Sequence, residues 1–218
     1  MNSEPLLNIA VRMNNEEMVN LLLEKGARIN KSDGKANTPL KVAIAEENIG
    51  MTAFLLENGA DVNDDGGGLG STPLHIAIKR RNFDIVRFLL EKGANPDIPY
   101  LDTVPLSAAI EDEEPKIVQL LLEGDANVSA QNAVGDTPLH IALNSFNPIQ
   151  DDLVDSKSKV EIIELLITRK PEFNVENFSG KTPIDIARQK MNELRESWKP
   201  AYRDFDLFLE DLIISYSF

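Results

Sequence analysis

The hexapeptide Thr-Pro-Leu-His-Ile-Ala stands at Thr72–Ala77 and again at Thr137–Ala142. Four weaker copies of the same pattern begin at Pro5, Thr38, Val104 and Thr182. Successive copies start 33, 34, 32, 33 and 45 residues apart. A short pattern that returns at a nearly constant interval indicates a chain of similar structural repeats. The spacing therefore predicts six repeats.

A second motif, a run of three large apolar residues, keeps the same interval. It begins 11 residues after the alanine that ends each of the first four copies. The runs are Leu21–Leu23, Phe54–Leu56, Phe88–Leu90 and Leu120–Leu122. In the fifth repeat this distance is 23 residues, which indicates an insertion of 12 residues near 147–158. Because the period resumes afterwards, we place the insertion in the turn between the two motifs of that repeat.

Each motif has a physical reason to form a helix. Proline suits the first turn of a helix, where its missing N–H has no partner to lose, and the threonine before it can cap the helix. The apolar run predicts a second helix, which Gly26, Gly59 and Gly93 would end because glycine adopts left-handed backbone easily. One such helix pair cannot bury its own apolar face. We therefore expect the repeats to stack on one another.

The hexapeptide and its period of about 33 residues resemble the ankyrin repeat, over nearly the whole chain. The resemblance implies an all-α solenoid of stacked helix-turn-helix repeats joined by β-hairpin-like loops. We predict a single domain, 1–218, with repeats at approximately 1–34, 35–68, 69–100, 101–133, 134–178 (including the insertion) and 179–218. The fourth repeat departs from the pattern, because Asp125 stands where the glycine is expected and Val104 replaces the threonine.

The two ends of a stack each have one face without a neighbour. The first repeat begins almost directly at its first helix, and we interpret it as an N-terminal cap. Residues 188–218 lack the three-residue apolar run and are interpreted as a C-terminal cap of one or two helices. Alternatively, they form a docking helix for another protein. The residues expected to cover the last apolar face are Trp198, Tyr202, Phe205, Phe208, Leu209, Leu212 and Ile213.

The composition excludes several classes of function. The chain has 218 residues, with 22 Lys and Arg against 36 Asp and Glu, and a formal net charge of −14. Such acidity argues against binding to nucleic acids and to anionic membranes. The absence of cysteine excludes disulfides, thiol nucleophiles and thiolate metal sites. With no long apolar run and no secretory signal pattern, we expect a cytoplasmic location, in the cell that makes the protein or in a cell that receives it.

The sequence offers little material for an active site. The only histidines, His75 and His140, occupy the same place in the hexapeptide, where the resemblance implies a structural hydrogen bond near the hairpin. Neither a Ser-His-Asp triad nor a histidine-based metal site can be assembled from them. We therefore predict no enzymatic activity, no cofactor, no metal ion and no small-molecule substrate. The alternative is a carboxylate-dependent hydrolase or ion-binding protein that uses the acidic stretch Glu111–Glu114 of the fourth repeat.

The resemblance implies recognition of another protein, through the hairpin tips and the exposed side of the first helix of each repeat. Apolar side chains at these positions have no stacking role, so we expect them to anchor a partner unless they pack on the adjacent hairpin. The candidate partner-binding residues are Leu69, Lys79, Arg80, Tyr100, Leu101, Glu111, Asp112, Val134 and Phe178.

Charge is distributed unevenly along the predicted binding surface. Residues 97–126 contain eight carboxylates against one lysine, whereas residues 71–96 contain five cations against two carboxylates. We expect the protein partner to have a basic or mixed-charge surface, because complementary charges steer association. The pattern leaves open whether the protein is an adaptor, an effector delivered into a host cell, or an inhibitor or immunity protein.

Overall fold

The computed structural model describes residues 5–67, 70–101, 103–147, 153–197 and 203–216, which form twelve α-helices and no β-strand. This confirms the predicted all-α class. The chain divides into two compact parts, an N-terminal unit (1–101) and a C-terminal unit (102–218). Each is described by itself, and the single-domain organisation stays a prediction.

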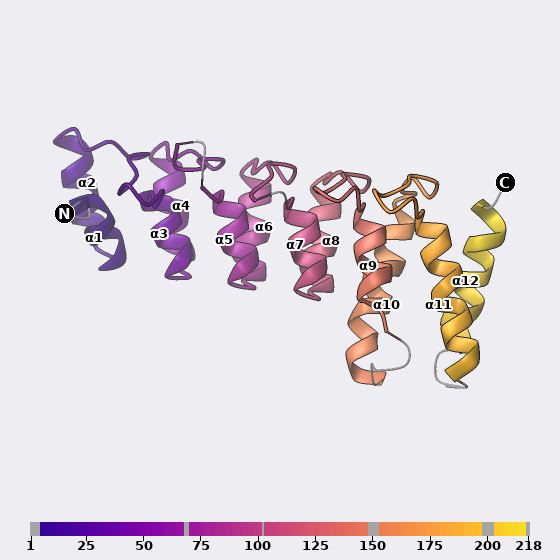
Figure 1. Ribbon diagram of the computed structural model, residues 1–218. Coiled ribbons are helices and arrows are strands. Elements are labelled where there is room, and N and C mark those ends of the chain that lie inside the picture. The colour runs from indigo at the N-terminus through magenta and orange to yellow at the C-terminus, as the bar shows by residue number, and fades with distance from the viewer. Residues whose placement is uncertain (1–4, 68–69, 102, 148–152, 198–202, 217–218) are drawn as a thin grey trace. The chain divides into compact units, whose positions relative to one another are not determined.

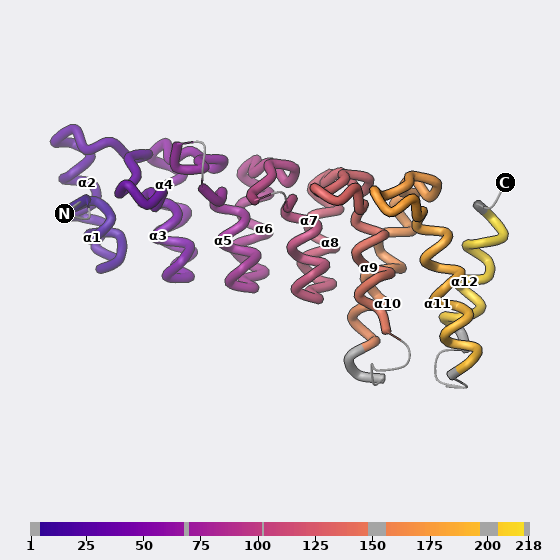
Figure 2. Tube along the Cα trace, in the orientation of Figure 1, coloured from indigo at the N-terminus to yellow at the C-terminus, as the bar shows by residue number. Residues whose placement is uncertain are grey.

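The N-terminal unit contains three helix pairs. They are α1 (Leu6–Arg12) with α2 (Glu16–Glu24), α3 (Pro39–Ala45) with α4 (Ile49–Glu57), and α5 (Pro73–Lys79) with α6 (Phe83–Glu91). Helix α1 packs against α3, and α3 packs against α5, so the first helices stack in order. Within this unit the long loops that follow the second helices gather at one edge (Figures 1 and 2).

The C-terminal unit contains the other three pairs. They are α7 (Pro105–Glu111) with α8 (Pro115–Glu123), α9 (Pro138–Ser145) with α10 (Leu153–Thr168), and α11 (Pro183–Ser197) with α12 (Arg203–Tyr216). Helix α9 packs against both α7 and α11. Residues 153–158 of the predicted insertion belong to α10, which reaches 16 residues, so the insertion lengthens a helix as well as the turn.

The second helix of each of the first three repeats begins with an asparagine cap. The Oδ1 atoms of Asn15, Asn48 and Asn82 accept hydrogen bonds from backbone amides three residues later, at 2.9, 2.9 and 3.1 Å. These bonds satisfy amides that have no partner inside the helix. A hydrogen-bonded asparagine therefore marks the start of each of these helices.

The predicted left-handed helix ends are confirmed. Gly26, Gly59 and Gly93 have φ angles of 88°, 89° and 86°. In the fourth repeat Asp125 takes the same kind of conformation, with φ of 60°. Aspartate is one of the few residues besides glycine that enters this region readily, so the departure in sequence leaves the helix end intact.

The core lies where the hexapeptide predicts it. In the four copies that begin at residues 38, 72, 104 and 137, the leucine in the third place and the alanine in the sixth are fully buried. They are Leu40, Leu74, Leu106, Leu139, Ala43, Ala77, Ala109 and Ala142. At the end of the chain, α12 packs on α11 and buries Phe205, Leu209, Leu212 and Ile213. The Phe205 ring lies 5.0 Å from that of Phe146. Four of the seven residues expected to cover the last apolar face are therefore buried, Phe208 is partly exposed, and Trp198 and Tyr202 lie outside the described residues. The interpretation of 188–218 as a C-terminal cap stays a prediction.

Candidate functional site

Two loops of the C-terminal unit form tight turns around an asparagine side chain. Asn132 Oδ1 accepts hydrogen bonds from the amides of Val134 and Asp136, at 3.0 and 2.9 Å. Asn177 Oδ1 does the same with the second and fourth residues that follow it, at 3.0 and 3.1 Å. Such Asx turns fix the backbone locally. Neither asparagine was predicted from the sequence to form a turn, although a glycine three residues after each is the local signal for it.

The two turns are joined, and the junction displays two apolar side chains. The Phe178 amide donates a hydrogen bond to the Val134 carbonyl, at 3.1 Å. A Cβ atom on Gly135 would lie 2.8 Å from Phe178 Cδ1, so only glycine lets the ring lie so close to the neighbouring turn. Val134 is 55% exposed and Phe178 is 80% exposed. We call this pair the tip patch: the backbone beneath it is fixed, while its apolar surface faces solvent.

The N-terminal unit repeats the turn at Asp33, whose Oδ1 accepts from the amides of Lys35 and Asn37, at 2.8 and 3.1 Å. Burial would raise the pKa of the Asp33 carboxyl, but hydrogen bonds from Asn37 and Lys35 outweigh it and lower the pKa below its ordinary value. The charged carboxylate therefore holds this turn at neutral pH.

The candidates Tyr100 and Leu101 differ in their surroundings. Tyr100 is half-buried, and its ring meets the His75 ring edge-on, with 5.7 Å between the ring centres. Packing on neighbouring structure was the alternative to partner binding for this residue. Leu101 is 77% exposed and has φ of 49°, a conformation that bulky residues rarely adopt. Of the two, Leu101 has the side chain more accessible to a partner.

The other sequence-derived candidates occupy helix ends. Lys79 and Arg80 are exposed at the end of α5, and Glu111 is exposed at the end of α7, with Asp112 partly exposed beside it. Leu69 lies outside the described residues. A partner-binding role for all nine candidates stays a prediction.

Both histidines are structural. Each Nδ1 atom lies 2.8 Å from the hydroxyl of the threonine that begins its hexapeptide, Thr72 or Thr137. His140 is fully buried, and its Nε2 lies 3.0 Å from the Lys181 carbonyl, to which it can only donate. The Lys181 carbonyl also accepts a hydrogen bond from the Asn177 amide, at 2.9 Å, which closes the turn that contains Phe178. Within the described ranges no group of three His, Asp or Glu residues could hold a metal ion.

Other repeats place a different residue in the histidine position. Lys41 is almost completely buried, and its Nζ donates to the Ala36 carbonyl at 2.8 Å. Burial lowers the pKa of Lys41, whereas nearby Asp64 and Asp65 favour its charged form. In the last repeat, Asp185 Oδ2 accepts from the Thr182 amide and hydroxyl, at 3.0 and 2.8 Å, which lowers the Asp185 pKa. Lys41 therefore forms a hydrogen bond with the loop before its own helix, and Asp185 forms hydrogen bonds with the residue that begins its own helix.

The acidic stretch of the fourth repeat contains a structural ion pair. Glu113 Oε1 lies 3.5 Å from Nζ of Lys159, a largely buried residue on α10. At least this member of the stretch Glu111–Glu114 therefore fastens α10 to the neighbouring repeat. No observation in the described residues favours catalysis at this stretch.

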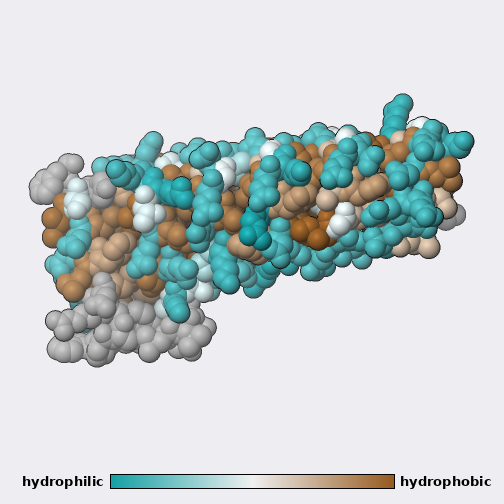
Figure 3. All heavy atoms as spheres, turned by 180° about the vertical axis from the view of Figure 1, so that it is seen from behind, coloured by the Kyte–Doolittle hydropathy of each residue, from teal (hydrophilic) through white to brown (hydrophobic). Residues whose placement is uncertain are grey.

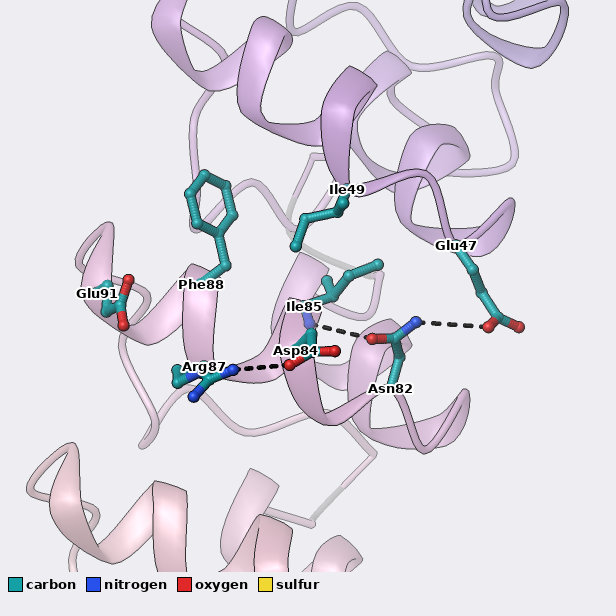
Figure 4. A pocket seen from close by; sticks show the side chains of 8 residues that line it. All are labelled: Glu47, Ile49, Asn82, Asp84, Ile85, Arg87, Phe88 and Glu91. Atoms are coloured by element: carbon teal, nitrogen blue, oxygen red, sulfur yellow. Dashed lines mark hydrogen bonds and ion pairs between the residues drawn. The ribbon is translucent and has the colours of Figure 1, made fainter.

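A surface hollow of about 400 Å³ lies beside α4 and α6, where no site was predicted from the sequence. Ile49 and Phe88 contribute its apolar lining. Figure 4 shows Arg87 turned toward Asp84, to which it donates at 2.7 Å, and Asn82 reaching toward Glu47, at 3.4 Å. Viewed from behind, the molecule also exposes apolar residues between polar ones (Figure 3). This hollow has a lining of both charged and apolar residues and is well separated in sequence from the tip patch.

Comparison with known proteins agrees with the repeat architecture. Residues 7–100 match the family described as ankyrin repeats (three copies). A curated relative from fowlpox virus (strain NVSL), which carries the name of an ankyrin repeat protein, is 36% identical over 58 residues, or 27% of this chain. That match spans only 13% of the relative. In the described part of the chain, no helix is both long and apolar enough to span a membrane.

Proposed function

Because this chain is an ankyrin repeat protein, we propose that it is a non-catalytic module that binds a protein partner through its hairpin tips and the exposed side of its first helices. Ankyrin repeats generally mediate interactions between proteins. The observation that carries the proposal here is the tip patch, where Val134 and Phe178 expose apolar side chains on a hydrogen-bonded backbone.

The fixed backbone of the tip patch favours binding for an energetic reason. Association costs conformational freedom whenever a loop must be ordered at the interface. The turns at Asn132 and Asn177 are already held by side-chain hydrogen bonds, so little further ordering is needed. A large exposed aromatic ring such as Phe178 is the type of group on which interface energy concentrates.

The proposed partner has a basic or mixed-charge surface, and the proposed location is cytoplasmic. The chain's net charge of −14 supports attraction to cations on the partner. The other proposed contact residues are Tyr100, Leu101, Lys79, Arg80, Glu111 and Asp112, of which Leu101 exposes an apolar side chain. Leu69 belongs to the same proposal by its place in the repeat register.

Affinity capture from cells of the source organism tests this function. The full chain and the double variant Val134→Ser with Phe178→Ser are each used as bait, and captured proteins are quantified by mass spectrometry. Ile49→Ser serves as a matched control, because Ile49 is 47% exposed but lies at the hollow beside α4 and α6. We expect a protein that the wild type and the control capture equally and the tip variant loses. Equal capture by all three would reject the tip patch as the binding site.

A further inference from the structure

The outward face of the first helix pair differs from the same face in the next two repeats. Met18, the third residue of α2, is 44% exposed. Met51 and Ile85 hold the same position in α4 and α6 and are 0% and 1% exposed. Leu22 is partly exposed, whereas its equivalents Leu55 and Leu89 are fully buried. These positions face the preceding repeat in a stack.

The first helix of the pair shows the same contrast. Leu6 begins α1 and is 69% exposed, whereas Pro39 and Pro73 begin α3 and α5 and are buried. A capping repeat needs a polar outer face to avoid association. We interpreted the first repeat as a cap from its sequence. Its outer face is nevertheless apolar, because its residues follow the pattern of the internal repeats.

A hollow of about 760 Å³ opens on this part of the N-terminal unit and has a basic lining. Its charged lining residues are Lys25, Arg28 and Lys31, and no carboxylate is among those lining residues that the structure describes. None of these three cations takes part in an ion pair recorded within the described residues. In a chain with a net charge of −14, an apolar hollow with three cations selects an occupant that is both apolar and acidic.

The last helix of the C-terminal unit has that chemistry on its outer face. Leu207 and Ile214 on α12 are 50% and 60% exposed, and Asp211 between them is also exposed. Spacings of four and three residues place all three side chains on one side of the helix. The opposite side carries Leu209 and Leu212, which are buried.

We propose that these two surfaces bind each other in different copies of the chain. The outer face of α12 in one copy docks on the first repeat of a second copy, with Leu207 and Ile214 against the apolar stacking face. Asp211 then lies near the cations of the hollow. The contact is head to tail, so the second copy keeps its own α12 face vacant and association can continue. This contact is independent of the tip patch.

Sedimentation velocity of the full chain tests the proposal, because association raises the sedimentation coefficient with concentration. The head variant carries Leu6→Arg and Met18→Arg, and the tail variant carries Leu207→Arg and Ile214→Arg. All four positions are exposed, so both variants are expected to fold, which circular dichroism checks. Each variant alone should self-associate at least about tenfold more weakly than the wild type, because an unpaired charge in an apolar contact is costly.

An equimolar mixture of the two variants gives the decisive result. The head variant keeps an intact tail and the tail variant an intact head, so they should form a 1:1 complex and nothing larger. The remaining pair of altered ends repels through its arginines. A wild type that stays monomeric at every concentration would overturn the proposal, as would variants that self-associate like the wild type or a mixture that forms no dimer. The variant with Val134→Ser and Phe178→Ser should self-associate normally, which separates this contact from partner binding.

Discussion

Two neighbouring places in the C-terminal unit reverse the usual distribution of polar and apolar residues. His140 is polar and fully buried, whereas Phe178 is apolar and 80% exposed. They are linked, because the His140 ring bonds the Lys181 carbonyl, which closes the turn that carries Phe178. The buried residue has its hydrogen bonds satisfied inside the protein, whereas most of the Phe178 side chain faces solvent. The difference separates a residue that holds the turn from a residue that the turn displays.

The comparison predicts a large loss of stability at the buried position. His140→Ala should lower the free energy of unfolding by about 3 kcal/mol, because it leaves a cavity and unpaired buried groups at Thr137 and Lys181. Chemical denaturation measures the change. Asn144→Ala, an exposed position on the same helix, is the control and should stay within about 0.5 kcal/mol of the wild type. Equal stability of the two variants would contradict the fastening role of His140.

A smaller effect is expected at the glycine beneath Phe178. Gly135→Ala should destabilise the protein by about 1–2 kcal/mol, because φ is positive and the new Cβ would meet the Phe178 ring. Gly180→Ala is a matched control: its φ of 69° is also positive, but nothing lies within 4 Å of its added Cβ. Denaturation curves should therefore show a larger loss at Gly135. If Gly180→Ala proved equally harmful, the Phe178 contact would not constrain the turn.

In the last repeat, the hydrogen bonds between Thr182 and Asp185 should make stability depend on pH. Hydrogen bonds from Thr182 lower the pKa of Asp185 in the folded state below its value in the unfolded chain. The charged carboxylate therefore contributes stability above the unfolded pKa, which is about 4, and this contribution is lost as pH falls through the folded pKa. Asp185→Asn should lower stability slightly at neutral pH and reduce the loss of stability in acid. Urea denaturation at several pH values checks this, and parallel curves for both proteins would refute it.

Local sequence patterns were enough to predict the helices and the core. Proline at the start of α5 or α9 and glycine after α6 act through their own backbone, so their effect does not depend on the rest of the fold. Register also identified Phe178 and Leu101 as exposed positions. The added turns of α10 were missed because residues 153–158 belong to no repeat and have no counterpart to compare.

Other features depend on contacts between distant residues. Burial of Lys41 depends on the loop that packs near it, including Asp64 and Asp65, and no local pattern reports that. The apolar face of the first repeat becomes evident only when exposure at Met18 is compared with that at Met51. The Asx turns at Asn132 and Asn177 are different, since their local pattern was available in the sequence and was overlooked.

The most direct test of the account measures binding and stability on the same variant. Once a captured partner has been purified, calorimetric titration gives its affinity for the wild type and for the variant with Val134→Ser and Phe178→Ser. The account predicts at least about tenfold weaker binding, with the free energy of unfolding changed by less than about 0.5 kcal/mol. Unchanged affinity, or weakened affinity that accompanies a comparable loss of stability, would contradict the claim that the tip patch is displayed for a partner.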